Sequence, residues 1–160
     1  MANTVISRSE AYAYHEPDLQ SRPELYGKYT RQSLRQAAFY TAADYIQAQR
    51  VRALVKAECA QALAEVDVLI TPTSINTAPT FEGHNPDAML TASSFTGIWN
   101  LVGLPALSVC GGFSRGLPIG MQIIGKPFDE PMVFKVGDAY QQISDWHTRV
   151  PELAREVQFA

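Results

Sequence analysis

The run Val66-Asp67-Val68-Leu69-Ile70-Thr71 constrains the fold more than any other stretch of this sequence. It is short, rich in β-branched residues and followed by Pro72, which predicts a β-strand that ends there. Because nearly every position is apolar, we expect both faces of this strand to be buried, as in a central strand of an α/β sheet. Two further apolar stretches, Pro105–Cys110 and Ile119–Ile124, predict two more strands. Three such strands are few for so much two-sided hydrophobicity, so we expect part of the sheet to be missing from the 160 residues.

The helices predicted around these strands indicate the fold class of the chain. From residue 42 to residue 66, apolar side chains recur every three or four positions, which predicts an amphipathic helix of about 24 residues with one apolar stripe. Thr41 with Asp44 approximates a capping box at its start, with Asp in place of Glu. Thr91–Val102 predicts a short helix, and Pro131 falls in the first turn of a last one. The order helix, strand, helix, strand, strand, helix predicts an α/β fold with an antiparallel or mixed portion.

Glycine and proline residues mark where the elements should break. A first helix near the N-terminus should end at Pro17, because proline disrupts helix interiors. The stretch Gly111–Gly116 is expected to join the second and third strands, with its first two glycines supplying the positive φ angles of a turn. A less favoured interpretation has the amides of those glycines holding an oxyanion. We expect residues 1–147 to form an ordered core and residues 148–160 a tail.

Composition excludes several classes of protein. Apolar residues make up 46% of the chain and charged residues 18%, which is unlike a disordered tail or a polar linker. The net charge of −3 leaves no basic stripe, so nucleic acid is not expected as a partner. No apolar run is long enough to cross a bilayer and no secretory signal is visible, so no membrane partner is expected. Two cysteines without disulfide or zinc spacing agree with a cytoplasmic location.

The sequence contains no complete catalytic constellation. Its three histidines lack the spacing of metal ligands, so neither a metal site nor a cofactor is expected. Gly120–Pro127 nearly matches a phosphate-binding loop, but Pro127 supplies neither a hydroxyl for magnesium nor the start of a helix. No serine lies in a Gly-x-Ser-x-Gly elbow or has a base at an informative spacing. An independent enzyme that uses Cys110 or Ser114 is a weaker alternative.

The stretch Thr91–Pro105 is the most suggestive of binding. Ser93 and Thr96 supply small hydroxyls, Trp99 supplies apolar surface, and Asn100 stands just before an apolar strand. A loop and short helix that lead into a buried strand commonly line a pocket, so these four residues are our substrate-binding candidates. Helix capping and core packing explain the same residues equally well.

Four linked segments carry a resemblance that covers nearly the whole chain. They are Asp44–Arg52, Val66–Thr73, Asn100–Val109 with the pattern Asn-x-x-Gly-x-Pro-Ala-x-Ser-Val, and Gly116–Glu130. In this order and spacing they resemble the C-terminal third of the amidase signature family. The resemblance implies amide and related acyl hydrolysis, and a large mixed sheet sandwiched by helices. Residues 1–160 would then be the C-terminal portion of an amidase domain, incomplete as a fold.

The catalytic residues of that family have no counterpart in this sequence. The family uses a Ser nucleophile, a second Ser on a cis peptide and a Lys, with glycine-rich amides as the oxyanion hole. The resemblance places them around a Gly-Gly-Ser-Ser-Gly-type segment, which is absent here. No catalytic residue is therefore carried over. We expect the chain to contribute sheet core and one wall of the acyl pocket, and to be inactive alone.

The resemblance also bears on substrate and partners. The resemblance implies that, in amidotransferase members, an acidic residue before the Asn motif recognises the amide substrate. The nearest equivalent in this sequence is Ser93. Recognition of a glutamine-type substrate is therefore not supported. Cys110 stands where the family usually has Pro, which leaves the following turn less rigid. A small-molecule amide substrate is expected only in the complete protein, with an N-terminal amidase portion or a second copy of the chain as partner. The alternative is a non-catalytic interaction module that completes its sheet with a partner chain.

Overall fold

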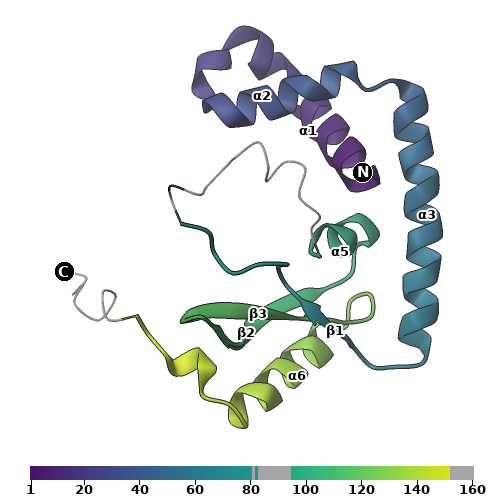
Figure 1. The fold of residues 1–160 in the computed structure, drawn as a ribbon. Coiled ribbons are helices and arrows are strands. Elements are labelled where there is room, and N and C mark those ends of the chain that lie inside the picture. Colours follow the sequence, from purple (N-terminus) through teal and green to yellow (C-terminus); the bar gives the residue numbers. More distant parts are fainter. Residues whose placement is uncertain (81, 83–94, 152–160) are drawn as a thin grey trace. The chain divides into compact units, whose positions relative to one another are not determined.

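The computed structural model describes residues 1–80, 82 and 95–151 of the chain. It combines helices with a small antiparallel sheet, as expected for the α/β class (Figure 1). The chain splits into two compact units. One is made of Met1–Cys59 and Asn100–Val102, and the other of Ala60–Trp99 and Gly103–Ala160. No helix among the described residues is both long enough and apolar enough to cross a bilayer.

Helices make up the first unit. Its elements are α1 (Ala2–Ser21), the 3-10 turn η1 (Pro23–Leu25), α2 (Lys28–Gln36), the 3-10 turn η2 (Ala37–Phe39) and, up to Cys59, the helix α3 (Ala42–Ala64). Ile6, Ala48 and Leu101 form its buried cluster. Arg8 Nη1 donates a hydrogen bond to Gln36 Oε1 (2.7 Å), which links α1 to the end of α2.

Helix α1 continues through Pro17, so the prediction that it ends there is wrong. Proline removes one backbone donor, but the turn beyond it has tertiary support, since Leu19 is only 5% exposed. Ser21 Oγ also donates to Pro17 O (2.7 Å), and Arg22 N donates to Asp18 O (2.8 Å). The sequence shows that a proline inside a helix destabilises it. It does not show the tertiary packing of Leu19 that offsets this cost.

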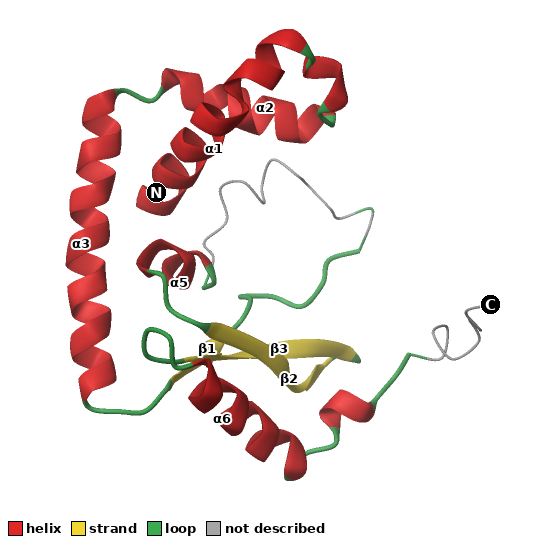
Figure 2. Ribbon diagram, turned by 180° about the vertical axis from the view of Figure 1, so that it is seen from behind, coloured by secondary structure: helices red, strands yellow, loops and turns green. Residues whose placement is uncertain are grey.

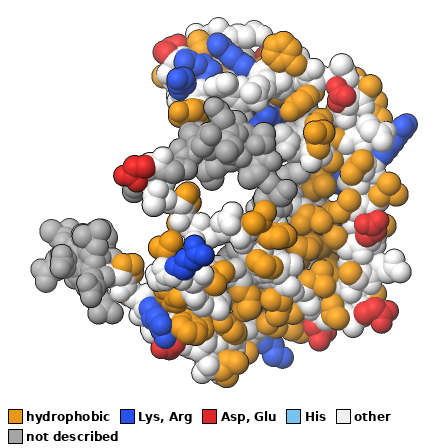
Figure 3. Space-filling model, viewed as in Figure 1, with side chains coloured by type: hydrophobic (Ala, Val, Ile, Leu, Met, Phe, Trp, Pro, Cys, Tyr) orange, Lys and Arg blue, Asp and Glu red, His pale blue; other side chains and the backbone are white. Residues whose placement is uncertain are grey.

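The long helix α3 and its cap are confirmed. Thr41 N donates to Asp44 Oδ2 (2.9 Å) and Asp44 N donates to Thr41 Oγ1 (3.1 Å), which is the reciprocal pairing of a capping box. The apolar stripe is covered only in places, because Ala48 and Leu63 are buried while Leu54 is 67% exposed. Many apolar side chains accordingly lie at the surface (Figure 3).

The sheet of the second unit is antiparallel throughout. Its strands are β1 (Leu69–Pro72), β2 (Ala106–Ser114) and β3 (Leu117–Ile124), in the order β1-β3-β2. The expectation of an antiparallel portion is therefore confirmed. The expectation that the first strand is central and buried on both faces is wrong for the described residues, because β1 lies at an edge and Ile70 is 57% exposed. An apolar sequence favours a strand but does not determine its place in the sheet.

The turn between β2 and β3 is shorter than predicted. It consists of Arg115 and Gly116, whose φ angles of 52° and 80° suit a two-residue hairpin turn. Gly111 and Gly112 lie inside β2 instead, where the register shifts between Cys110 and Gly112 as in a β-bulge. The prediction that Gly111 and Gly112 form the turn is wrong. Glycine is favoured both in turns and in bulges, so the sequence pattern does not distinguish them.

One face of the sheet is apolar and packs on a helix (Figure 2). The helix is α6 (Glu130–Gln142), which has Pro131 in its first turn as predicted. Val109, Ile123 and Val133 form the buried cluster between them. A Cβ on Gly137 would lie 2.7 Å from Leu107 Cδ2, so the helix backbone lies close against β2.

A short helix and a 3-10 turn complete the described chain. The helix α5 (Gly97–Val102) confirms the second half of the predicted Thr91–Val102 helix, whereas residues 91–94 lie outside the described residues. The 3-10 turn η3 (Trp146–Thr148) contacts β2.

Candidate functional site

The face of the sheet opposite α6 carries several polar side chains and has an apolar end, where Ile124 pairs with Leu69 and Ala106. Thr71 and Ser108 are both paired in register with Gln122 of the middle strand, so the three side chains lie side by side on that face. Two residues further along the middle strand is Gly120, which pairs with Cys110. In this part of the sheet, polar or small residues therefore alternate with the apolar ones that pack on α6.

Two hydroxyl groups meet across the middle strand at Gly120. Thr73 N donates to Gly120 O (2.9 Å), and the hydroxyls of Thr73 and Ser108 are hydrogen-bonded at 2.6 Å. Residues on the two outer strands of a three-stranded sheet are normally about 10 Å apart, so this contact needs a middle residue without a side chain. Between them the hydroxyls have two protons, and their mutual bond uses one, which leaves one proton for a further acceptor.

Gln122 is the buried polar residue of this face, with 4% exposure. Its Nε2 donates to Thr71 Oγ1 (3.2 Å) and to the backbone oxygen of Phe95 (3.3 Å). Phe95, two residues before α5, therefore lies against the polar face. We call Thr71, Thr73, Ser108 and Gln122, with Gly120 between them, the polar sheet face.

The structure describes three of the four residues predicted to bind substrate. Ser93 lies outside the described residues. Thr96 is at the N-cap position of α5, Trp99 is buried at 8% exposure, and Asn100 is exposed. Trp99 Nε1 has no hydrogen-bond partner in the described part of the chain. A pocket wall built from these residues stays a prediction.

Sequence reasoning missed the polar sheet face. In the sequence, Ser108 stands in the segment Asn100–Val109, and Gly120 and Gln122 stand in Gly116–Glu130 and in the near match to a phosphate-binding loop. The available signal was the placement of polar or small residues at every second position of two apolar strands. That alternation predicts one polar face, although it cannot predict that Thr73 reaches Ser108.

Groups that could act as nucleophile or metal ligand are sparse in the described residues. No three His, Cys, Asp or Glu side chains in this part gather as metal ligands would. Burial, assisted by the charge of Glu58, raises the pKa of the Cys59 thiol, so its reactive thiolate is disfavoured. His15 Nδ1 is 3.0 Å from the hydroxyl of Tyr26, at an edge-to-face ring contact.

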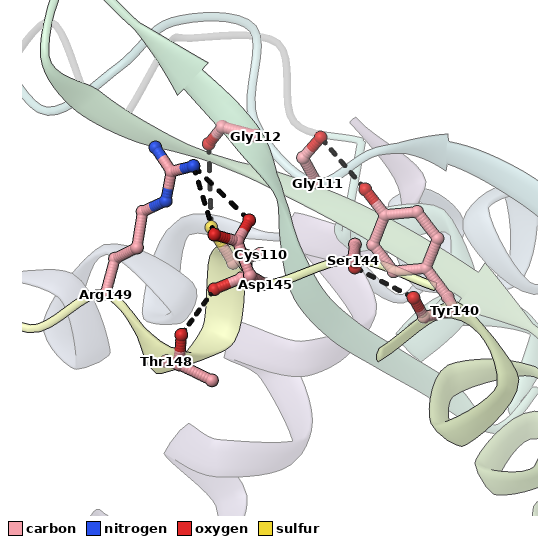
Figure 4. A network of polar contacts seen from close by, with 8 residues as sticks. All are labelled: Cys110, Gly111, Gly112, Tyr140, Ser144, Asp145, Thr148 and Arg149. Atoms are coloured by element: carbon pink, nitrogen blue, oxygen red, sulfur yellow. Dashed lines mark hydrogen bonds and ion pairs between the residues drawn. The ribbon is translucent and has the colours of Figure 1, made fainter. Parts of the chain in front are cut away.

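A group of polar contacts surrounds the bulged part of β2 (Figure 4). The Tyr140 hydroxyl donates to Gly111 O (3.1 Å), and Cys110 Sγ donates to Gly112 O (3.5 Å). The Arg149 guanidinium is paired with Asp145 at 3.3 Å and stacks 4.1 Å from the centre of the Trp146 ring. These contacts satisfy backbone oxygens and pack rings, so we interpret the network as structural.

Comparison with known proteins shows which family the chain resembles. The family model described as Amidase matches residues 3–134. A glutamyl-tRNA(Gln) amidotransferase subunit of Chloroflexus aggregans is 44% identical over 155 residues, which cover 92% of this chain and 32% of the relative. The protein of the same name from Halorhodospira halophila is 48% identical over 120 residues, which cover 72% of this chain and 24% of the relative.

Solved structures show the same similarity. A crystal structure described as an amidase superposes with a TM-score of 0.76 at 26% identity, over 88% of this chain and 34% of that one. The corresponding glutamyl-tRNA(Gln) amidotransferase subunit of Thermotoga maritima superposes with a TM-score of 0.57 at 31% identity, over 81% of this chain and 31% of that one. The chain thus spans 24% to 32% of the length of these curated relatives. By its family match, its relatives and its fold, the chain belongs to the amidase signature family.

Proposed function

We propose that these 160 residues form a sheet segment of an amide hydrolase and one wall of its acyl pocket. The observation that carries the proposal is the difference between the two sheet faces. The apolar face packs on α6, whereas the opposite face carries the Thr73–Ser108 hydroxyl pair and the buried amide of Gln122. A mostly apolar wall with a few fixed polar groups is typical of a small-molecule site. The substrate class is a carboxylic amide that is not a peptide.

We further propose that the chain alone does not hydrolyse amides. The sequence lacks the Gly-Gly-Ser-Ser-Gly-type segment that carries the family's nucleophile. Within the described residues, the Ser108 hydroxyl is bonded to Thr73 rather than to a histidine, lysine or carboxylate that could take up its proton. A serine without such a base is a weak nucleophile. A cytoplasmic location and the absence of a nucleic-acid partner are parts of the same proposal.

A serine-directed fluorophosphonate probe tests the inactive state. We expect the 160-residue chain to remain unlabelled, and an active member of the family to be labelled under the same conditions. Covalent labelling of a serine in this chain, located by mass spectrometry, would overturn the proposal of inactivity.

Complementation tests the role as a pocket wall. The chain is mixed with the part of the Chloroflexus aggregans relative that it does not match, and hydrolysis of a simple amide is followed by ammonia release. We expect activity only when both pieces are present. An Arg149→Ala variant serves as the control and should complement as well as the parent chain. Its side chain contacts Trp146 of η3 and Phe113 rather than the polar sheet face. If the pieces form a complex without activity, the pocket-wall role is refuted.

A specific observation also supports a second candidate, a non-catalytic module that pairs its sheet with a partner chain. Strand β1 lies at the sheet edge with Ile70 57% exposed, and edge strands readily pair with other chains. The relatives are named as subunits of an amidotransferase, and one similar structure is described as part of a vestigial protein complex. Light scattering on the purified chain separates a second copy as partner from a monomer. The substitution Ile70→Lys should abolish any such dimer.

The substrate of the complete protein is a separate part of the proposal. The relatives' names concern a glutamyl-tRNA amidotransferase, whereas Ser93 stands where the resemblance places an acidic residue. We propose that glutamine is not the preferred amide. In the complementation assay, glutamine should be a poorer substrate than an uncharged primary amide, and a Ser93→Asp variant should narrow the difference.

A further inference from the structure

Gln122 joins two segments that are far apart in the sequence. Its side chain is 4% exposed and lies in the middle strand β3. Its Nε2 donates one hydrogen bond to Thr71 Oγ1 (3.2 Å) in β1 and a second to Phe95 O (3.3 Å), just before α5. Thr71 precedes the connection from β1 to α5, and Phe95 ends it. A single amide therefore attaches both ends of this connection to the centre of the sheet.

A glutamine is chemically suited to this position. The side-chain amide has two N–H donors, and the two bonds use both of them. Because the amide is buried, a donor left without an acceptor would lose its water without compensation. The bond to Phe95 O is consequently costly to break, although it is a single bond to a backbone oxygen.

The short helix that follows Phe95 needs such an external attachment. It has six residues, far fewer than an isolated helix needs for stability in water. Its far end is fixed by Gly103 N and Leu104 N, which both donate to Trp99 O at 2.9 and 3.1 Å. The Gln122 bond fixes the near end, one residue before the N-cap position of the helix.

We infer that Gln122 is a positioning residue that sets where Phe95–Trp99 lies on the polar sheet face. If the proposed function is correct, this segment is part of the acyl-pocket wall, and Gln122 acts on substrate binding through it. Gln122 itself need not touch the substrate. Its two bonds differ in role, since the one to Thr71 joins strands that are already paired, whereas the one to Phe95 attaches the segment.

Residue-resolved hydrogen exchange on the 160-residue chain separates these two roles. The reporters are the amides of Gly103 and Leu104, which bond to Trp99 O. Gln122→Met removes both side-chain bonds and should accelerate exchange at the reporters about tenfold. Thr71→Val removes one of the same two bonds, keeps the bond to Phe95, and should leave the reporters within about twofold of the parent chain. A purely structural role would move the reporters equally in both variants.

Equal acceleration in the two variants, or none in Gln122→Met, would overturn the inference. If Gln122→Met does not fold, Gln122→Asn takes its place, because it keeps the donors but is too short to reach both acceptors. The complementation assay adds an independent readout, in which Gln122→Met should raise KM for the amide more than it lowers kcat. Failed complementation would count against the proposed function, whereas the exchange result needs no activity and decides the positioning role by itself.

Discussion

Replacing Gly120 with alanine should destabilise the sheet, although alanine is ordinarily the better residue within a strand. The added Cβ would lie 2.7 Å from both Cβ and Oγ1 of Thr73, and 3.1 Å from Ser108 Oγ. Real Cβ atoms do not approach that closely, so Thr73 must move and its 2.6 Å bond to Ser108 must break. Thr73 cannot move freely, because its backbone N–H is bonded to Gly120 O at 2.9 Å.

The size of the effect follows from three contributions. Loss of the hydroxyl bond costs about 1 kcal/mol. Forcing a methyl group into a filled site costs about 1–3 kcal/mol. Removal of a glycine from the strand returns about 0.5–1 kcal/mol. The free energy of unfolding should therefore fall by about 2 kcal/mol, which lowers the urea midpoint by about 1 M for a domain of ordinary m value.

Tryptophan fluorescence during urea unfolding measures this effect. Both tryptophans, Trp99 and Trp146, belong to the same unit as the sheet. Ser108→Ala is the matched comparison, because it removes the same hydroxyl bond without adding an atom near Gly120, and should cost about 1 kcal/mol. A Gly120→Ala chain as stable as the parent, or no less stable than Ser108→Ala, would refute the argument that the two hydroxyls meet only because this position has no side chain.

Four smaller tests concern other parts of the fold. Thr41→Ala should lower the stability of the chain by about 1 kcal/mol in thermal unfolding, because α3 loses its capping box. The hydrogen bonds from Thr41 lower the pKa of Asp44 from its ordinary 3.8, so the contribution of Asp44 is present above that pH and is lost as the pH falls through the folded-state value. Asp44→Asn should therefore flatten the acid limb of a stability–pH curve. Tyr140→Phe should cost about 1 kcal/mol in urea unfolding by leaving Gly111 O without its donor. Cys59 should react with iodoacetamide more slowly in the folded chain than in urea, since burial raises its pKa, and equal rates would contradict that.

Local signals in the sequence predicted much of the fold. The Thr41–Asp44 cap, the helix that follows it and the proline in the first turn of α6 each depend on residues within one turn of each other. The resemblance in four linked segments predicted the family, which the family match confirms. These successes share a cause, because caps, periodicity and motifs are encoded at short range.

Features that depend on distant residues were not predictable in this way. Pro17 lies inside α1 because Leu19 is buried by tertiary packing, which no local rule includes. The central position of β3 depends on which strands pair, and all three strands are similarly apolar. The candidate site depends on the same long-range pairing, since Gln122 is paired with Thr71 and Ser108 only through the register of two ladders.

The bulge in β2 shows how that register determines which residues share a face. Cys110 pairs with Gly120 and Gly112 pairs with Ile119, so β2 has one more residue than β3 at this point. On the N-terminal side of the bulge, the alternation of side chains along β2 places Ser108 beside Gln122, and Val109 packs on α6. A one-residue slip of that segment would exchange the two faces and bring Val109 into the position of Ser108. Since Tyr140 of α6 bonds to Gly111 inside the bulge, the helix on the apolar face helps to fix the register that forms the polar one.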